Sequence, residues 1–219
     1  MNRILGLCSL TLLFGGCGSS PETASDPALA AAMADGEMSE HCEKHADPEV
    51  TDYARSEHEY PLPDVTLTDH TGTPVRAPEI AGSDRPVVLN FVFATCTTIC
   101  PVMSATFARA REMLGEDADR LDFVSITIDP EHDTPAILAE YAEKYDATSN
   151  WRFLTGEGHD VEQVVRALDS FNGSKFSHKP ITMLHRPGQA AWVRLEGLGS
   201  ASDLVAEIRT SLLTEPMLQ

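Results

Sequence analysis

The sequence predicts an α/β domain in which a central mixed sheet is flanked by helices, with a β-hairpin at its N-terminal end. Apolar runs with the texture of buried strands lie at 85–94 and 121–129. Amphipathic helical patterns follow them at 133–146 and 159–171. Alternation of buried strands with helices is typical of α/β proteins, and no internal repeat suggests another architecture.

The first half of this domain contains two strand signals, a hairpin and a helix. Residues 65–75 alternate apolar and polar side chains around His-Thr-Gly-Thr, which predicts the hairpin. The run 85–94 is rich in Val and Phe, as expected for a strand covered on both faces. Residues 100–116 carry apolar residues at helical spacing with a proline suited to the first turn, and 121–129 predicts a second buried strand.

The second half predicts two helices, a short strand, a hairpin and a last helix. The helix at 133–146 has Asp133 or Thr134 as its cap and Pro135 just inside. A short strand at 151–156 precedes the amphipathic helix at 159–171. The remaining signals are a hairpin at 181–197, which turns at Arg-Pro-Gly, and a final helix at 200–213 capped by Ser200 or Ser202.

The N-terminus has the layout of a secretory signal. Residues 1–16 hold one basic residue, an apolar run at 4–14 and then small residues. That run is too short to cross a bilayer, which takes about 20 residues. The segment Leu-Phe-Gly-Gly before Cys17 resembles a bacterial lipoprotein processing site, so we expect Cys17 to be lipidated. Ordinary cleavage that leaves Cys17 free is the alternative.

The segment 17–59 is expected to be a disordered acidic tether. It is rich in Pro, Ala, Ser and Glu and lacks a sustained apolar face, so it cannot bury enough surface to offset its ordering entropy. The whole chain has a net charge of −18. This charge argues against nucleic acid as a partner, because such proteins cluster Lys and Arg. The folded domain is expected at 60–219, as a monomer.

Cys96 and Cys100 form a pair with three intervening residues where the first long strand meets the following helix. A helix N-terminus favours the thiolate, which is both a metal ligand and a nucleophile. The third spacer still permits a disulfide and lets both sulfurs turn toward a shared ion. Soft thiolates favour Cu(I), which accepts two or three ligands, over zinc, which prefers four. A thiol pair at this position of an α/β pattern matches the thioredoxin-like fold.

Three stretches resemble the SCO/SenC family. FVFATCTTICPVM is similar to that family's Cys-x-x-x-Cys-Pro signature, and ITIDPEHDTPAILAEYAEKY to its Asp-Pro-Glu-x-Asp-Thr-Pro block. The third is His178, shortly before the hairpin. The resemblance covers roughly residues 60–213.

This resemblance implies a thioredoxin-like copper chaperone tethered on the periplasmic side of a bacterial membrane. Cys96, Cys100 and His178 would bind one copper ion, as Cu(I) or Cu(II), and Asp129 would be an accessory residue near them. The implied partner is the copper-receiving subunit of cytochrome c oxidase, whose dinuclear copper site the protein would supply or keep reduced. Other periplasmic copper or thiol carriers are further expected partners, and the lipid at Cys17 would hold the chain to the membrane.

Two departures from the family bear on this function: the first would weaken Cu(II) binding, and the second keeps a redox function open. The family usually has Asp before its histidine, whereas this chain has Ser177. Pro180 falls where thioredoxins carry a cis-proline facing their cysteines. The alternative function is therefore a membrane-tethered thiol–disulfide oxidoreductase, in which Cys96 attacks and Cys100 resolves the mixed disulfide.

Other candidate residues have simpler expected roles. His132 is expected to be exposed, His185 to be an outward strand residue and Asp133 to cap a helix. In the tether, the copper-ligand types Met38, His41, Cys42 and His45 recur at helical spacing, which raises the hypothesis of a second copper site.

Overall fold

The computed structural model describes residues 53–170 and 173–214. The chain divides into two units, Met1–Ala46 and Asp47–Gln219. The first unit lies outside the described residues, and so do the predicted signal, Cys17 and the ligand types between Met38 and His45.

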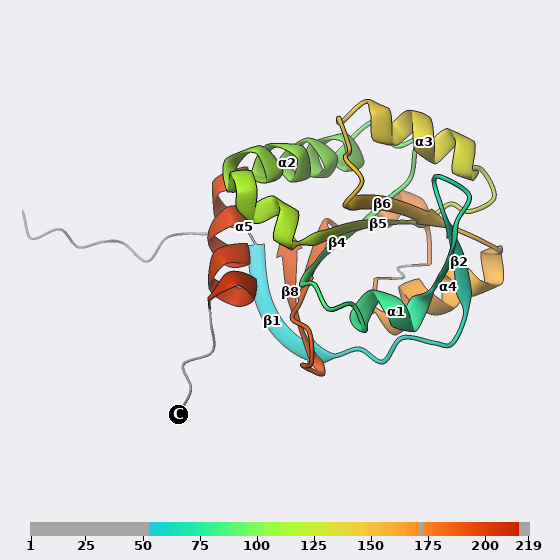
Figure 1. The fold of residues 1–219 in the computed structure, drawn as a ribbon. Coiled ribbons are helices and arrows are strands. Elements are labelled where there is room, and N and C mark those ends of the chain that lie inside the picture. The colour runs from blue at the N-terminus through green and yellow to red at the C-terminus, as the bar shows by residue number, and fades with distance from the viewer. Residues whose placement is uncertain (1–52, 171–172, 215–219) are drawn as a thin grey trace, which may run out of the picture. The chain divides into compact units, whose positions relative to one another are not determined.

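The described residues of the second unit form a mixed eight-stranded sheet in the order β1-β8-β7-β4-β5-β6-β2-β3 (Figure 1). Its strands are β1 Tyr53–Glu59, β2 Thr66–Asp69, β3 Pro74–Arg76, β4 Val87–Val92, β5 Asp122–Thr127, β6 Trp151–Thr155, β7 Ile181–His185 and β8 Ala191–Gly197. Strands β4, β5 and β6 are parallel, and β7 runs antiparallel to β4. The predicted thioredoxin-like α/β class is confirmed, including the hairpin β2–β3.

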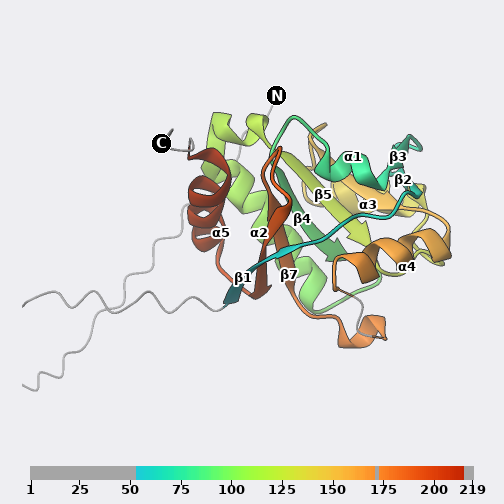
Figure 2. The same ribbon diagram turned by 90° about the horizontal axis from the view of Figure 1, so that it is seen from below.

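Helices cover both faces of the sheet (Figures 1 and 2). They are α1 Ala77–Ala81, α2 Ile99–Leu114, α3 Pro135–Glu143, α4 Gly158–Ala167 and α5 Ala201–Ile208, with 3-10 turns at Gly115–Arg120 and Lys175–Ser177 and a π-helical turn at Arg209–Leu213. No helix within the described residues is both long and apolar enough to traverse a lipid bilayer.

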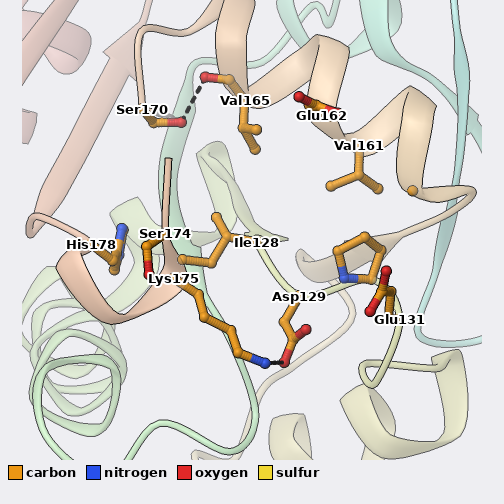
Figure 3. A pocket seen from close by; sticks show the side chains of 12 residues that line it. Ile128, Asp129, Glu131, Val161, Glu162, Val165, Ser170, Ser174, Lys175 and His178 are labelled. Atoms are coloured by element: carbon orange, nitrogen blue, oxygen red, sulfur yellow. Dashed lines mark hydrogen bonds and ion pairs between the residues drawn. The ribbon is translucent and has the colours of Figure 1, made fainter. Parts of the chain in front are cut away.

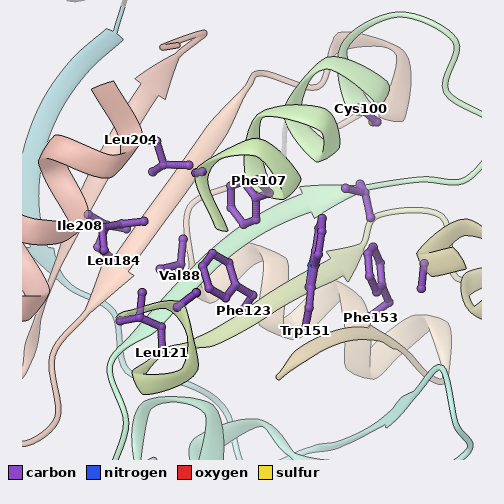
Figure 4. Close-up of a cluster of buried hydrophobic side chains, with 14 of the residues drawn as sticks. Val88, Cys100, Phe107, Leu121, Phe123, Trp151, Phe153, Leu184, Leu204 and Ile208 are labelled. Atoms are coloured by element: carbon purple, nitrogen blue, oxygen red, sulfur yellow. The ribbon is translucent and has the colours of Figure 1, made fainter. Parts of the chain in front are cut away.

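Two apolar cores, one on each face, hold the helices to the sheet. The core under α2, α3 and α5 includes Phe123, Trp151 and Phe153, which lie side by side on the sheet, and Phe107, which projects from α2 toward them (Figure 4). The second core packs α1 and α4 against the opposite face of the same strands. Since β4 contributes to both cores, all six of its residues are buried, as its continuous apolar sequence predicts.

The folded part begins earlier than the sequence predicts. Residues 53–59, assigned to the tether, form β1 and pair antiparallel with β8 along their whole length. The Tyr53 hydroxyl also donates a hydrogen bond of 3.0 Å to Glu207 in α5. The prediction failed because β1 is an edge strand with mostly exposed side chains, so its sequence lacks an apolar alternation.

One further sequence-based expectation requires correction, and one short helix was missed. His185 is buried at 3% exposure rather than outward-facing. Its ring nitrogen Nε2 donates to the Gln189 carbonyl at 2.9 Å, and the ring lies 4.4 Å from that of Trp192. The short helix α1 was not predicted, because five residues are too few to show a helical period.

The topology brings three functional segments to one edge of the sheet. Parallel strands β4 and β5 both end there, and the antiparallel strand β7 begins there. The cysteine segment follows β4, the Asp-Pro-Glu block follows β5, and His178 precedes β7. This edge therefore carries all the site residues predicted within the folded part.

Candidate functional site

Cys96 and Cys100 meet at the N-terminus of α2 as free thiols. The Cys100 backbone N–H donates to the Cys96 sulfur at 3.4 Å, and the N-cap residue Thr98 forms no side-chain cap. The sulfur thus takes the place of a capping oxygen for one of the free N–H groups of the first turn. Cys96 is 8% exposed and Cys100 is fully buried, so the first sulfur is the more accessible one.

The surroundings shift the pKa values of the two thiols in opposite directions. Burial alone would raise the pKa of Cys96, but hydrogen bonds from the N–H groups of Cys100 and Thr98 outweigh it and lower that pKa below 9.0. Burial, followed by the hydrogen bond with Cys96, raises the pKa of Cys100 to about 12. Cys96 is therefore the thiolate-forming member, and Cys100 holds its proton until a partner or an ion favours its release.

The buried carboxylate of Asp133 holds the backbone of the segment that leads to Cys96. Asp133 is fully buried, and both of its oxygens accept from the Ala94 N–H at 3.2 Å. One oxygen also accepts from the Thr127 hydroxyl at 2.5 Å. Asp133 does not cap α3 as an N-cap; Thr134 does, accepting from the Ile137 N–H. The carboxylate thus serves as the acceptor for one buried donor, the Thr127 hydroxyl, and one partly buried donor, the Ala94 N–H.

His178 is held by β4. Its ring Nε2 donates to the Phe91 carbonyl at 3.2 Å, which leaves Nδ1 as the unprotonated nitrogen. Nδ1 is buried and has no hydrogen-bond partner. Burial lowers the pKa of His178, against the opposing effect of the bond to Phe91, so the ring is neutral at physiological pH. A neutral imidazole with a free nitrogen is a competent ligand for copper or zinc.

A cavity of about 300 Å³ separates the His178 segment from α4 (Figure 3). Residues 128–131, which follow β5, line its floor together with Val161 and Val165 of α4. Lys175 crosses this floor and pairs with Asp129 at 2.5 Å. His132, which is exposed as predicted, binds the other Asp129 oxygen at 3.0 Å. Burial would raise the pKa of Asp129, but these two partners lower it.

The structure brings the predicted site residues together only in part. Cys96 and Cys100 are in contact, and His178 and Asp129 lie at the same edge of the sheet and line one cavity. Across residues 53–170 and 173–214, however, no three His, Cys, Asp or Glu side chains gather closely enough to hold a metal ion. The His178 ring is committed to Phe91 rather than to the sulfurs.

Comparison with known proteins identifies the family. The model of the family described as SCO1/SenC matches residues 55–212. The chain belongs to the SCO1/SenC family. This confirms the resemblance drawn from the sequence, and the match begins within β1, in agreement with the earlier start of the fold.

Relatives of this SCO1/SenC chain are distant. The SCO1 protein homolog of Bacillus subtilis is 36% identical over 84 residues, which cover 37% of this chain and 42% of that protein. The chain spans about half the length, or less, of the curated relatives it matches.

Two solved structures share the SCO1/SenC fold. ScoI of Bradyrhizobium japonicum with copper bound has a TM-score of 0.53 and 20% identity over 66% of this chain and 95% of that one. BsSco, described as a member of the Sco family of cytochrome c oxidase assembly proteins with a disulfide switch, has a TM-score of 0.59 and 22% identity over 71% and 95%. At these identities the comparison establishes the common fold.

Sequence reasoning about the SCO1/SenC domain missed Lys175 and Thr127. Lys175 contacts Asp129 across 46 positions, and its ammonium also lies 5.9 Å from the centroid of the Phe93 ring. Thr127 accepts from the Asp129 N–H at 2.9 Å while it donates to Asp133. One local signal could have pointed to Lys175: it is a basic residue three positions before the predicted ligand His178 in a strongly acidic chain.

Proposed function

We propose that this protein binds one copper ion through Cys96 and Cys100, with His178 as the third ligand. The observation that carries the proposal is the contact of two free thiols at the N-terminus of α2, where the Cys100 N–H donates to the Cys96 sulfur and favours the Cys96 thiolate. Two soft sulfurs and one imidazole are a donor set that suits Cu(I), and the imidazole extends it to Cu(II). The unpartnered Nδ1 of His178 fits this role.

Copper titration of site variants tests the proposal. In the full chain, Cys96→Ser and Cys100→Ser should each remove one copper equivalent. His178→Ala should weaken binding, mostly of Cu(II), because a two-thiolate site still suits Cu(I). His159→Ala is the matched control, since this histidine is exposed at the start of α4. Full copper binding in both serine variants would refute the assignment.

The proposed recipient is the copper-receiving subunit of cytochrome c oxidase. The chain would pass copper to the dinuclear site, or keep that site's thiols reduced. This proposal rests on family membership and on the description of BsSco as belonging to the oxidase assembly proteins. Loss of the oxidase's dinuclear copper signal in a strain lacking this protein, restored by wild type but not by Cys96→Ser, is the expected result.

The competing function is thiol–disulfide exchange. The separation of the two thiol pKa values favours it. The Cys96 thiolate would attack one sulfur of a partner disulfide and expel the other as a thiolate. Cys100 would then lose its proton and attack the Cys96 sulfur, which releases the partner as a dithiol and leaves a Cys96–Cys100 disulfide. His178→Ala discriminates, because it should spare this exchange and impair copper delivery.

Membrane attachment and a second copper site complete the proposal. Cys17 would carry the lipid on the periplasmic side of a bacterial membrane, so Cys17→Ser should release the protein from the membrane fraction. Additional copper would be captured in the tether by four residues, Met38, His41, Cys42 and His45. Replacing these four in the full chain should lower the Cu(I) stoichiometry, and an unchanged stoichiometry would eliminate the second site.

A further inference from the structure

A continuous chain of hydrogen bonds links the cysteine segment to the His178 segment. Asp133 holds Ala94, two residues before Cys96, and accepts from Thr127. The Thr127 hydroxyl in turn accepts from the Asp129 N–H at 2.9 Å. The Asp129 carboxylate pairs with Lys175, three residues before His178.

Asp129 and Lys175 form one of the two most sheltered ion pairs of the described residues, the other being Arg194 with Glu196 at 8% and 34% exposure. The Asp129 side chain is 7% exposed and that of Lys175 24%. Other pairs are more open, and Lys179 with Glu196, close to His178 on its other side, has 55% and 34% exposure at 2.6 Å. A sheltered pair is screened less by solvent and is more costly to break than an exposed one. Lys175 also contacts the ring of Phe93, in the segment that leads to Cys96.

The ion pair between Asp129 and Lys175 lies next to the His178 segment. Lys175 begins the 3-10 turn Lys175–Ser177, and His178 is the residue directly after that turn. With Lys175 fixed on Asp129, the ring of His178 donates to the Phe91 carbonyl, and its Nδ1 is buried without a partner. In this conformation His178 and the two thiols do not gather at one metal position within the described residues, so the ring has to move in order to join them. The cavity of about 300 Å³ borders Asp129, Lys175 and His178 but neither cysteine, so these three side chains have open space beside them.

We infer that Asp129 and Lys175 are positioning residues that hold His178 on Phe91 and away from the thiol pair, so that completing a three-ligand copper site requires their ion pair to open. This inference rests on the proposed function for its consequence, though not for the positioning itself. A ligand that is competent in only a fraction of molecules binds more weakly by that fraction. The pair would therefore keep Cu(II) affinity low and ease the release of copper to an acceptor.

The first experiment needs no copper. Diethyl pyrocarbonate acylates unprotonated imidazole nitrogens, and its attack on His178 in the metal-free full chain can be followed by mass spectrometry, with exposed His159 as internal reference. Lys175→Met keeps the length and apolar stem of the side chain and removes the charge. It should accelerate modification of His178 by about three- to tenfold, as expected if the held state loses its main restraint. Lys175→Arg should stay near the wild-type rate, because a guanidinium can keep the pair.

Matched controls separate positioning from a general charge effect. Lys179→Met removes a neighbouring lysine and its exposed ion pair, and it should leave the His178 rate unchanged. Asp129→Asn should reproduce the effect of Lys175→Met, and the double variant should add nothing, since both changes break the same contact.

The second experiment measures Cu(II) affinity by competition with a chelator. Lys175→Met should tighten Cu(II) binding by about three- to tenfold in the wild-type background. In the His178→Ala background it should have no effect. An unchanged modification rate in Lys175→Met overturns the positioning role, whether or not the thiols bind copper. Faster modification with unchanged Cu(II) affinity overturns its link to copper. If the chain binds no copper at all, the proposed function fails, while the modification result still decides whether the pair positions His178.

Discussion

Replacing Asp133 by alanine should destabilise the folded part and loosen the cysteine segment. The carboxylate is fully buried and accepts from two donors, the Ala94 N–H and the Thr127 hydroxyl. Asp133→Ala would leave the Thr127 hydroxyl as an unsatisfied buried donor, at about 1–3 kcal/mol, and the partly buried Ala94 N–H would add less, so the free energy of unfolding should fall by about 2–4 kcal/mol. Asp133→Asn keeps the size and one acceptor oxygen and should lose clearly less. Urea unfolding followed by tryptophan fluorescence measures both, because Trp151 lies in the same core as Ala94.

The pH dependence of the same pair of proteins provides an independent test. Burial raises the pKa of Asp133 above its ordinary value of 3.8, despite the hydrogen bonds from Thr127 and Ala94 that lower it. Between the unfolded and the raised folded pKa, the folded state binds the proton more tightly, so the free energy of unfolding falls as pH rises through this window. Asp133→Asn removes that loss. Its stability relative to wild type should therefore improve from pH 3.5 to neutral pH.

Two results would refute this reasoning. If Asp133→Ala unfolds within about 1 kcal/mol of wild type, the carboxylate does not satisfy the two donors. If the difference between Asp133→Asn and wild type stays constant with pH, the buried carboxyl does not have a raised pKa.

Three other predictions follow from the described contacts. Iodoacetamide should alkylate Cys96 well before Cys100, because Cys96 is the more accessible and the more readily ionised thiol, and the Cys96 rate should rise with pH through a pKa below 9.0. Peptide mass spectrometry measures both rates, and faster labelling of Cys100 would contradict this prediction. Burial lowers the pKa of His185 below 6.5, so the free energy of unfolding of the wild type should fall as pH falls through 6.5. Urea unfolding at pH 7.5 and 5.5 should show a smaller fall for His185→Gln, and an equal fall in both proteins would contradict this prediction. A chain beginning at Asp47 should have the same melting temperature as the full chain, whereas a chain beginning at Tyr60 should have a lower one, since it lacks β1. Equal melting temperatures of the two shortened chains would show that β1 does not stabilise the fold.

The sequence determines the core elements because their signals are local. The continuous apolar run of β4 and the helical spacing in α2 each reflect burial on a face set by backbone geometry, so a short window is enough to predict them. The Cys96–Cys100 pair is similarly local, since three spacers at a strand–helix junction fix both thiols near one helix end. Together with the Asp-Pro-Glu block, these patterns also identified the SCO1/SenC family.

Only the tertiary structure decided which polar side chains are structural and which stay available. Asp133 had the sequence position of a helix cap, but it satisfies donors 39 and 6 positions away. His185 stood in a strand with no local sign of the Trp192 ring that covers it. The contact of Lys175 with Asp129 spans 46 positions, and no periodic pattern encodes it. Such roles depend on which buried donors and acceptors meet after the chain has folded, and that pairing is set by packing rather than by spacing.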